Sequence, residues 1–132
     1  MKSSNTFTSL IFYFSAFYDG ILGMFFLIFP KVGFDFFNVT HPNHWGYVQF
    51  PAALLVVFGF MFFAIARNPL KERNLIPYGI GLKVSYCAVV FGYWFTKGLP
   101  DMWKPFAVID FFLGILFVFS YLMLGKQLKD EG

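Results

Sequence analysis

The chain has 132 residues, of which 58% are hydrophobic and 13% are charged. A soluble domain carries about a quarter charged residues, and a core of this size cannot bury 22 Phe and 7 Tyr. The composition therefore excludes an ordinary soluble domain and predicts an all-α membrane protein with an aromatic coat facing lipid. The net charge of +3 fits contact with anionic lipid headgroups and does not indicate nucleic-acid binding.

Four apolar segments each approach the length of about 20 residues that crosses a hydrocarbon core. We expect them to form an antiparallel four-helix transmembrane bundle, a single domain over residues 1–132. The predicted helices cover residues 8–29, 45–66, 75–95 and 105–124. Pro77 and Pro105 fall in first turns, where proline is tolerated, whereas Pro51 lies deeper. The second helix is therefore expected to begin late or to bend.

The first apolar segment follows Lys2 and has a signal peptide as its alternative reading. A signal peptide has a shorter apolar region, followed by small residues at a cleavage site. This segment is longer and ends in Phe29 and Pro30. We interpret it as a helix of the mature protein.

The connection over residues 31–44 mixes aromatic with polar side chains, among them Phe34, Asp35 and Phe36. This mixture predicts a segment that lies in the membrane interface or folds back over the bundle as a lid. A plain surface connector is the alternative. His41 and His44 lie near Asp35 in this connection, but no predicted helix fixes them, and we predict no metal site.

The lysines and arginines outside the apolar segments indicate the orientation. If the helices alternate in direction, six lie on one side of the membrane and three on the other. The six are Lys2, Arg67, Lys71, Arg73, Lys126 and Lys129, and the three are Lys31, Lys97 and Lys104. The positive-inside rule then predicts two cytoplasmic termini in a multi-pass protein of a bacterial inner membrane or a plasma membrane.

Three charged residues, Asp19, Lys83 and Asp110, lie within the apolar segments. A charge at bilayer depth costs about 3 to more than 10 kcal/mol, so such residues pair, face the protein interior or line a water-filled cavity. At a rise of about 1.5 Å per residue, Asp19 and Lys83 are nearly level and Asp110 lies nearer the outer side. We predict an Asp19–Lys83 ion pair and expect Asp110 to need another partner.

Candidate partners for Asp110 at its depth are Gln49, Tyr47 and Trp94. Tyr86 follows Lys83 on the same helix face. The predicted ligand-binding or proton-relay residues are thus Asp19, Lys83, Asp110, Gln49, Tyr86, Tyr47 and Trp94. The alternative is a buried ion pair that only fixes helix register, with the glycines serving close helix packing.

Five stretches of the chain share their layout with a known type of membrane protein. They are Tyr18-Asp-Gly-Ile-Leu-Gly, Phe29-Pro30, His44-Trp-Gly-Tyr-Val-Gln-Phe, Ile80-Gly-Leu-Lys83 and Phe106-Ala-Val-Ile-Asp110. With them the chain resembles, over nearly its whole length, the DoxX-like small four-helix bacterial membrane proteins. The resemblance implies the four-helix fold and an association with a quinone or a partner subunit. It implies no catalytic residue.

Three classes of function remain open. The favoured class is a binding or accessory subunit whose polar pocket holds a lipid-like or quinone-like molecule or a partner helix. The second is a proton- or solute-coupled carrier that uses Asp19, Lys83 and Asp110. The third, an enzyme with Asp110 as general acid or base, lacks a second catalytic group at that depth. The expected partners are the lipid bilayer and a partner membrane subunit or further copies of the chain.

Overall fold

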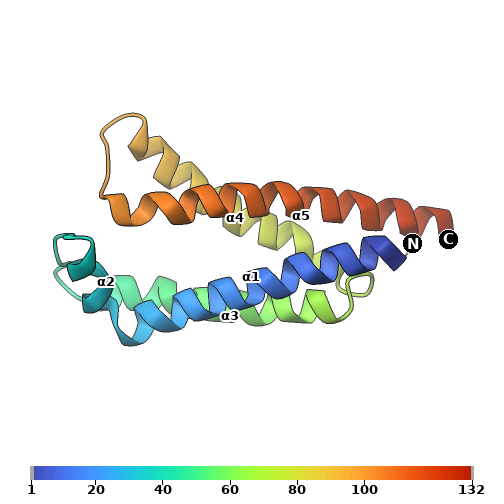
Figure 1. The fold of residues 1–132 in the computed structure, drawn as a ribbon, viewed down its shortest axis with the longest axis horizontal. Helices are drawn as coiled ribbons and strands as arrows, with labels where there is room; N and C mark the ends of the chain where they lie inside the picture. Colours follow the sequence, from blue (N-terminus) through green and yellow to red (C-terminus); the bar gives the residue numbers. More distant parts are fainter. Residues whose placement is uncertain (1, 132) are drawn as a thin grey trace.

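The computed structural model describes residues 2–131, and every regular element in this range is helical. The four long helices are α1 (Lys2–Ile28), α3 (Gly46–Arg67), α4 (Ile76–Trp94) and α5 (Lys104–Glu131). The short elements are α2 (Pro30–Phe36) and the 3-10 turns η1 (Arg73–Leu75) and η2 (Asp101–Trp103). Both termini lie at one end of the bundle and α2 lies at the other (Figure 1). We call these the terminal end and the α2 end.

The four long helices are long and apolar enough to cross a membrane, which confirms the predicted all-α class and its four apolar helices. Two predicted ends are wrong, since α1 begins at Lys2 and α5 continues to Glu131. The prediction stopped where the apolar runs stop, but neither flank contains a proline to end the helix. The expected late start of the second helix is also wrong, because α3 begins at Gly46 and continues through Pro51.

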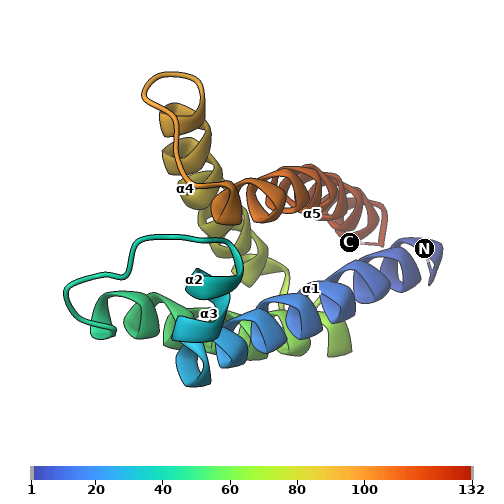
Figure 2. The same cartoon turned by 60° about the vertical axis from the view of Figure 1, so that its left-hand side comes forward.

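The helices pack as two pairs. α1 runs along α3, α4 packs on α5, and contacts between α1 and α5 join the pairs. A close approach occurs at Gly23 of α1, where an added Cβ would lie 2.6 Å from the carbonyl oxygen of Ala52 in α3. α4 crosses α5 obliquely, and at the α2 end it stands well away from α3 (Figures 1 and 2). The two pairs are therefore open toward the α2 end.

The core contains a layer of three fully buried rings, Phe12, Phe62 and Phe117, which we call the aromatic layer. Phe12 stacks on Phe117 with ring centroids 4.3 Å apart, and Phe62 lies 5.2 Å from Phe117. Gly79 of α4 leaves room for this layer, because an added Cβ would lie 2.7 Å from the Phe62 ring. The layer ties α1, α3 and α5 together.

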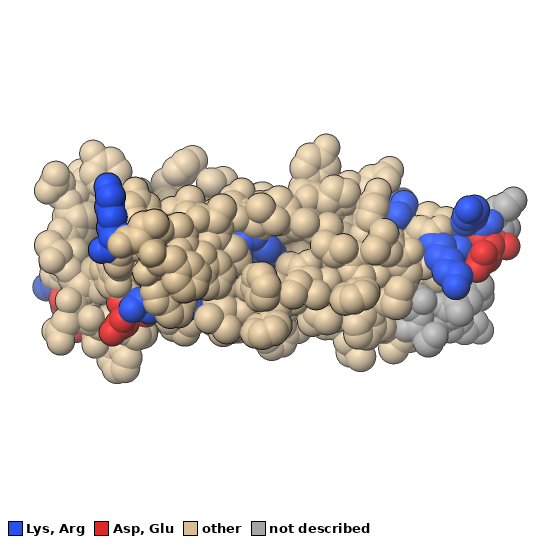
Figure 3. Space-filling view, turned by 90° about the horizontal axis from the view of Figure 1, so that it is seen from above, with Lys and Arg blue, Asp and Glu red and all other residues tan. Residues whose placement is uncertain are grey.

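The outer surface between the two ends is apolar. Charged side chains gather at the two ends of the molecule, with a nearly unbroken uncharged band between them (Figure 3). Large side chains such as Leu10, Ile21 and Phe60 are exposed in this band. Such a surface is stable against lipid chains, because hydrocarbon solvates it without the cost that water imposes.

Candidate functional site

Lys83 of α4 lies between the two buried aspartates. Its Nζ is 2.9 Å from Asp19 Oδ2, 3.2 Å from Asp19 Oδ1 and 3.0 Å from Asp110 Oδ1. Lys83 and Asp19 are each 1% exposed and Asp110 is 8% exposed. These three residues, which we call the charged cluster, connect α1, α4 and α5 in the middle of the apolar band.

The predicted Asp19–Lys83 ion pair is present, but the expectation that Asp110 needs a different partner is wrong. The same lysine serves both acids. The depth estimate counted residues along helices taken as parallel, whereas α4 is oblique to α5 (Figure 2). Gly114 of α5 lies beside Lys83, since an added Cβ there would be 3.4 Å from Lys83 Cβ. Asp110 is therefore within reach of the lysine.

The suggested partners of Asp110 make other contacts. Gln49 Nε2 donates a hydrogen bond to the carbonyl oxygen of Leu27 at 3.1 Å. The Trp94 ring stacks on Phe91 with centroids 5.8 Å apart and lies 5.1 Å from Lys104 Nζ. Gln49 and Trp94 thus connect helix ends, and the side chain that contacts Asp110 is that of Lys83.

The two predicted tyrosines lie at different depths. Tyr47 is 72% exposed at the start of α3, with its ring 6.3 Å from that of His44. Tyr86 is half-buried, and its hydroxyl donates to the carbonyl oxygen of Trp103 at 2.9 Å. Neither hydroxyl bonds to Asp110, although both tyrosines border the same cavity as that aspartate.

This cavity has a volume of about 550 Å³ and is open between the helix pairs. The buried residues Asp19 and Asp110 border it, and so does the exposed Tyr47. Phe34 of α2 and Pro42 of the following loop contribute to its wall at the α2 end. The remaining wall is aromatic or aliphatic. The cavity is therefore mainly apolar, with two acidic residues in its wall.

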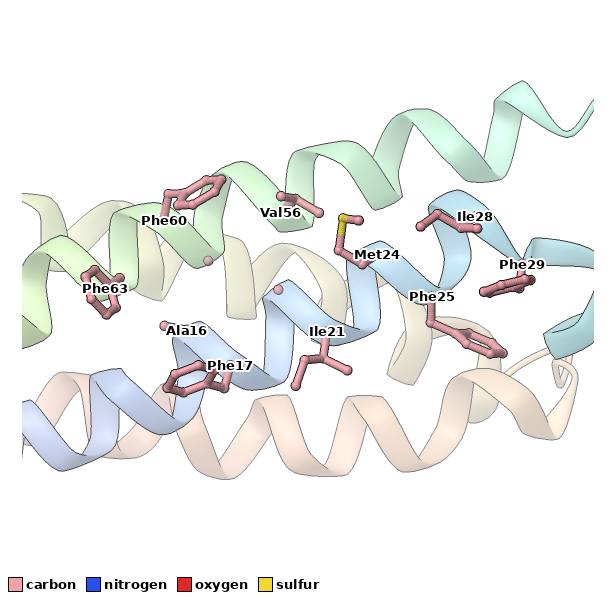
Figure 4. Close-up of a pocket in the computed structure, with 12 residues that line it drawn as sticks. Ala16, Phe17, Ile21, Met24, Phe25, Ile28, Phe29, Val56, Phe60 and Phe63 are labelled. Atoms are coloured by element: carbon pink, nitrogen blue, oxygen red, sulfur yellow. The ribbon is translucent and has the colours of Figure 1, made fainter.

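A second hollow lies between α1 and α3. It measures about 670 Å³ and is lined by apolar residues without any titratable group. Ile21 and Met24 of α1 and Phe60 and Phe63 of α3 border it (Figure 4). Although this groove is larger, it presents only apolar surface. The cavity at the charged cluster also has the ionisable groups of Asp19 and Asp110 in its wall.

The ammonium of Lys83 is also surrounded by aromatic rings. Its Nζ lies 5.5 Å from the Phe62 centroid, 5.7 Å from that of Tyr18 and 5.9 Å from that of Phe117. Ring faces attract a cation, so they offset part of the desolvation of the buried lysine. Two carboxylates and one ammonium give a formal net charge of −1 when all three are ionised.

A row of buried polar side chains on the terminal side of the aromatic layer was not predicted as a group. Its members are Thr8, Ser120 and Gln127, whose side-chain oxygens have no hydrogen-bond partner. Ser15 lies on the other side of the layer, next to the charged cluster, and is likewise unpaired. The signal was in the sequence, since Thr8 and Ser15, like Ser120 and Gln127, are seven residues apart and share a helix face.

The histidines of the α2 end face different neighbours. His41 Nε2 lies 2.5 Å from Asp35 Oδ1, while His44 Nδ1 accepts a hydrogen bond from the Gly46 amide at 2.9 Å. Within residues 2–131 no group of three His, Cys, Asp or Glu side chains is placed to hold a metal ion. The contact between His41 and Asp35 closes the loop that follows α2.

The fold and site define a class, an all-helical protein with four membrane-spanning-length helices and a buried charged cluster at the end of a cavity. Comparison of the chain with family models, curated proteins and solved structures gave no match. The resemblance to DoxX-like proteins therefore stays a prediction.

Proposed function

We propose that this multi-pass membrane protein is a binding or accessory subunit that holds a lipid-like or quinone-like molecule. The molecule lies in the 550 Å³ cavity with its polar head at Asp19 and Asp110. The observation that carries the proposal is the position of two buried carboxylates at the inner end of an otherwise apolar cavity. Tyr86 is the further polar residue that borders the cavity near them.

The size and lining of the cavity support this proposal. Small-molecule sites measure about 300–1,000 Å³ and combine apolar walls with a few convergent polar groups. A membrane-dissolved molecule enters such a site without leaving an apolar environment. Its head group then provides the polar contacts that the buried acids need.

The segment after α1 has the position of a lid in this proposal. Phe34 is 4% exposed, and its ring lies 5.3 Å from that of Trp45 and 6.1 Å from that of Trp103. These edge contacts hold α2 and its loop across the cavity at the α2 end. The excess of lysines and arginines at the terminal end supports an orientation with cytoplasmic termini and the lid on the outer side.

A carrier is the second candidate. It is favoured because the charged cluster has two acids but only one lysine. Two acids share one lysine, so one acid is able to exchange a proton or a cation while the other keeps the lysine paired. An enzyme is less well supported, because beyond these carboxylates the cavity wall offers only the hydroxyls of Tyr47 and Tyr86, and neither bonds to an aspartate.

Native mass spectrometry of the protein, extracted gently from its own membrane, tests the proposal. We expect either an apolar adduct of small mass or a stoichiometric protein partner. V48W places an indole in the cavity and is expected to remove the adduct, whereas V57W, on the lipid-facing side of the same helix, is expected to keep it. A bare protein in every preparation, or an adduct that survives V48W, contradicts the proposal.

A further inference from the structure

We infer that the ligand of this cavity is a lipophilic cation with a hydrogen-bond donor, such as an apolar amine, and that it takes the place of one proton in the charged cluster. This inference rests on the proposed function, since it names the ligand class of the same cavity. Three properties of the cluster carry it, namely which groups face the cavity, how their charges balance and what surrounds them.

The groups that face the cavity are hydrogen-bond acceptors. An ammonium has three hydrogens, and Nζ of Lys83 lies within hydrogen-bond distance of three oxygens, two of Asp19 and one of Asp110. Lys83 does not border the cavity, but both acids do. Asp110 contacts the lysine through Oδ1, and we assign its Oδ2 as the atom that receives the ligand. Once Asp110 is ionised, a head group that donates hydrogen bonds matches this end of the cavity, and a carboxylate does not.

The charge balance requires one further positive charge. Asp19 and Lys83 neutralise each other, which leaves the charge of Asp110 uncompensated in a buried site. An uncompensated charge is unfavourable in an apolar interior. Asp110 is the more exposed of the two acids, and it has one contact with the lysine where Asp19 has two. We therefore place the compensating proton of the empty site on Asp110.

The exchange is balanced in atoms and charge. The O–H bond of the Asp110 carboxyl breaks, its electron pair stays on the oxygen, and the proton leaves to water. The ammonium of the ligand then donates its hydrogen bonds to the resulting carboxylate. One cation enters for each proton released, so the charge of the buried site is the same before and after.

The remaining titratable groups near the exchange site do not alter this count. They are Tyr18 of α1 and Tyr86 and Cys87 of α4, which face the cluster, and Tyr47 of α3, which borders the cavity at its exposed end. Each is uncharged when protonated. α3 otherwise presents apolar side chains, including the Phe62 ring beside Lys83.

The aromatic wall favours a cation over a neutral or anionic ligand. Phe58, Phe106 and Trp103 border the cavity together with Tyr86. The faces of such rings attract a positive charge, most strongly where water is excluded. The hydrocarbon part of the ligand packs on the same rings, so the charged head and the apolar body are both accommodated.

Isothermal titration calorimetry of the protein in nanodiscs tests this inference with three probes that share one naphthylalkyl body. Their heads are a primary amine, an alcohol and a carboxylate, and empty nanodiscs correct for partition into lipid. We expect the amine to bind at least about tenfold more tightly than the alcohol, with no saturable binding of the carboxylate. Titrations in buffers of different ionisation enthalpy should show about one proton released per amine.

D110N supplies the matched variant, because the amide has the same shape and carries no exchangeable charge. It is expected to lose the proton release and the preference for the amine while still binding the alcohol. D101N, at an exposed position outside the cavity, is the control and should behave as the unchanged protein.

The outcomes separate the inference from the proposed function. Equal binding of amine and alcohol, or amine binding without proton release, overturns the inference and leaves the cavity as a binding site. Failure of all three probes to bind contradicts both. The proton count is measured on the unchanged protein, so the inference stays testable even where D110N does not fold.

Discussion

Phe12 of α1 stacks on Phe117 of α5 at 4.3 Å, and each ring lies seven residues from the aspartate of its own helix, Asp19 or Asp110. Seven residues are about two turns of a helix, so the ring pair and the acid pair lie on the same faces of two antiparallel helices. This shared register brings both acids to Lys83. The charged cluster is therefore positioned by aromatic packing as well as by charge.

Replacing Lys83 should strongly destabilise the protein. K83M leaves the buried Asp19 and Asp110 without their cation, and we expect a loss of about 3–5 kcal/mol in the free energy of unfolding. Chemical unfolding in detergent measures the change. The triple variant D19N/K83M/D110N, which removes every charge from the cluster, should recover much of the loss. A triple variant as unstable as K83M would contradict the charge argument.

K104M is the control for K83M. Lys104 pairs with the exposed Asp101 at 2.8 Å, and an exposed pair of this kind contributes about 1 kcal/mol or less. Its removal, which also deletes the contact of the ammonium with the Trp94 ring, should lower the free energy of unfolding by no more than about 2 kcal/mol.

The contact between α1 and α3 should tolerate no side chain at Gly23. G23V brings a Cβ to within 2.6 Å of the Ala52 carbonyl oxygen, and overpacking of this kind costs about 1–3 kcal/mol. G20A is the matched control on the same helix, because an added Cβ there meets nothing within 4 Å. Thermal unfolding should distinguish the two, and equal melting temperatures would argue against the close packing.

The α2 segment should loosen when its buried ring is removed. F34A deletes the contacts with Trp45 and Trp103, so hydrogen exchange over residues 30–45 should accelerate by about tenfold or more. F36A removes a ring that is 80% exposed on the same helix and should leave the exchange unchanged. Similar exchange in the two variants would show that Phe34 does not hold the segment.

The aromatic layer should separate the cavity from the polar side chains at the terminal end. F117A opens space beside Thr8 and Ser120, which already have unpaired buried oxygens, and water is expected to enter there. Liposomes that contain this variant and a trapped pH dye should leak protons faster than those with F119A, a change on the lipid-facing side of α5. An equal leak would contradict a sealing role for the layer.

Much of the fold follows from hydropathy, because four apolar runs of spanning length leave few arrangements in a bilayer. The Asp19–Lys83 pair followed from the cost of a buried charge. The contact between Lys83 and Asp110 was not predicted, because it depends on the oblique crossing of α4 over α5. Counting residues along helices taken as parallel does not predict such a crossing. The same limit explains why Gln49 and Trp94 were wrongly expected beside Asp110.

The cavity could not be predicted from the sequence, for a related reason. Its wall combines side chains from all four long helices, α2, η2 and the loop after α2, so its volume depends on how far the two helix pairs diverge. The composition of residues 31–44 indicated a segment at the membrane interface, yet gave no sign of which ring would be buried. Phe34 is buried and Phe36 is not, because only one side of the short α2 faces the bundle.

The single ammonium at the centre of the protein makes two kinds of connection. Its contacts with Asp19 cross from one helix pair to the other, whereas its contact with Asp110 stays within the pair formed by α4 and α5. Loss of the Asp110 contact would therefore remove a bond inside one half of the molecule and leave the contacts between the halves in place. The two contacts of Lys83 with Asp19, which join the halves, are separate from its contact with Asp110.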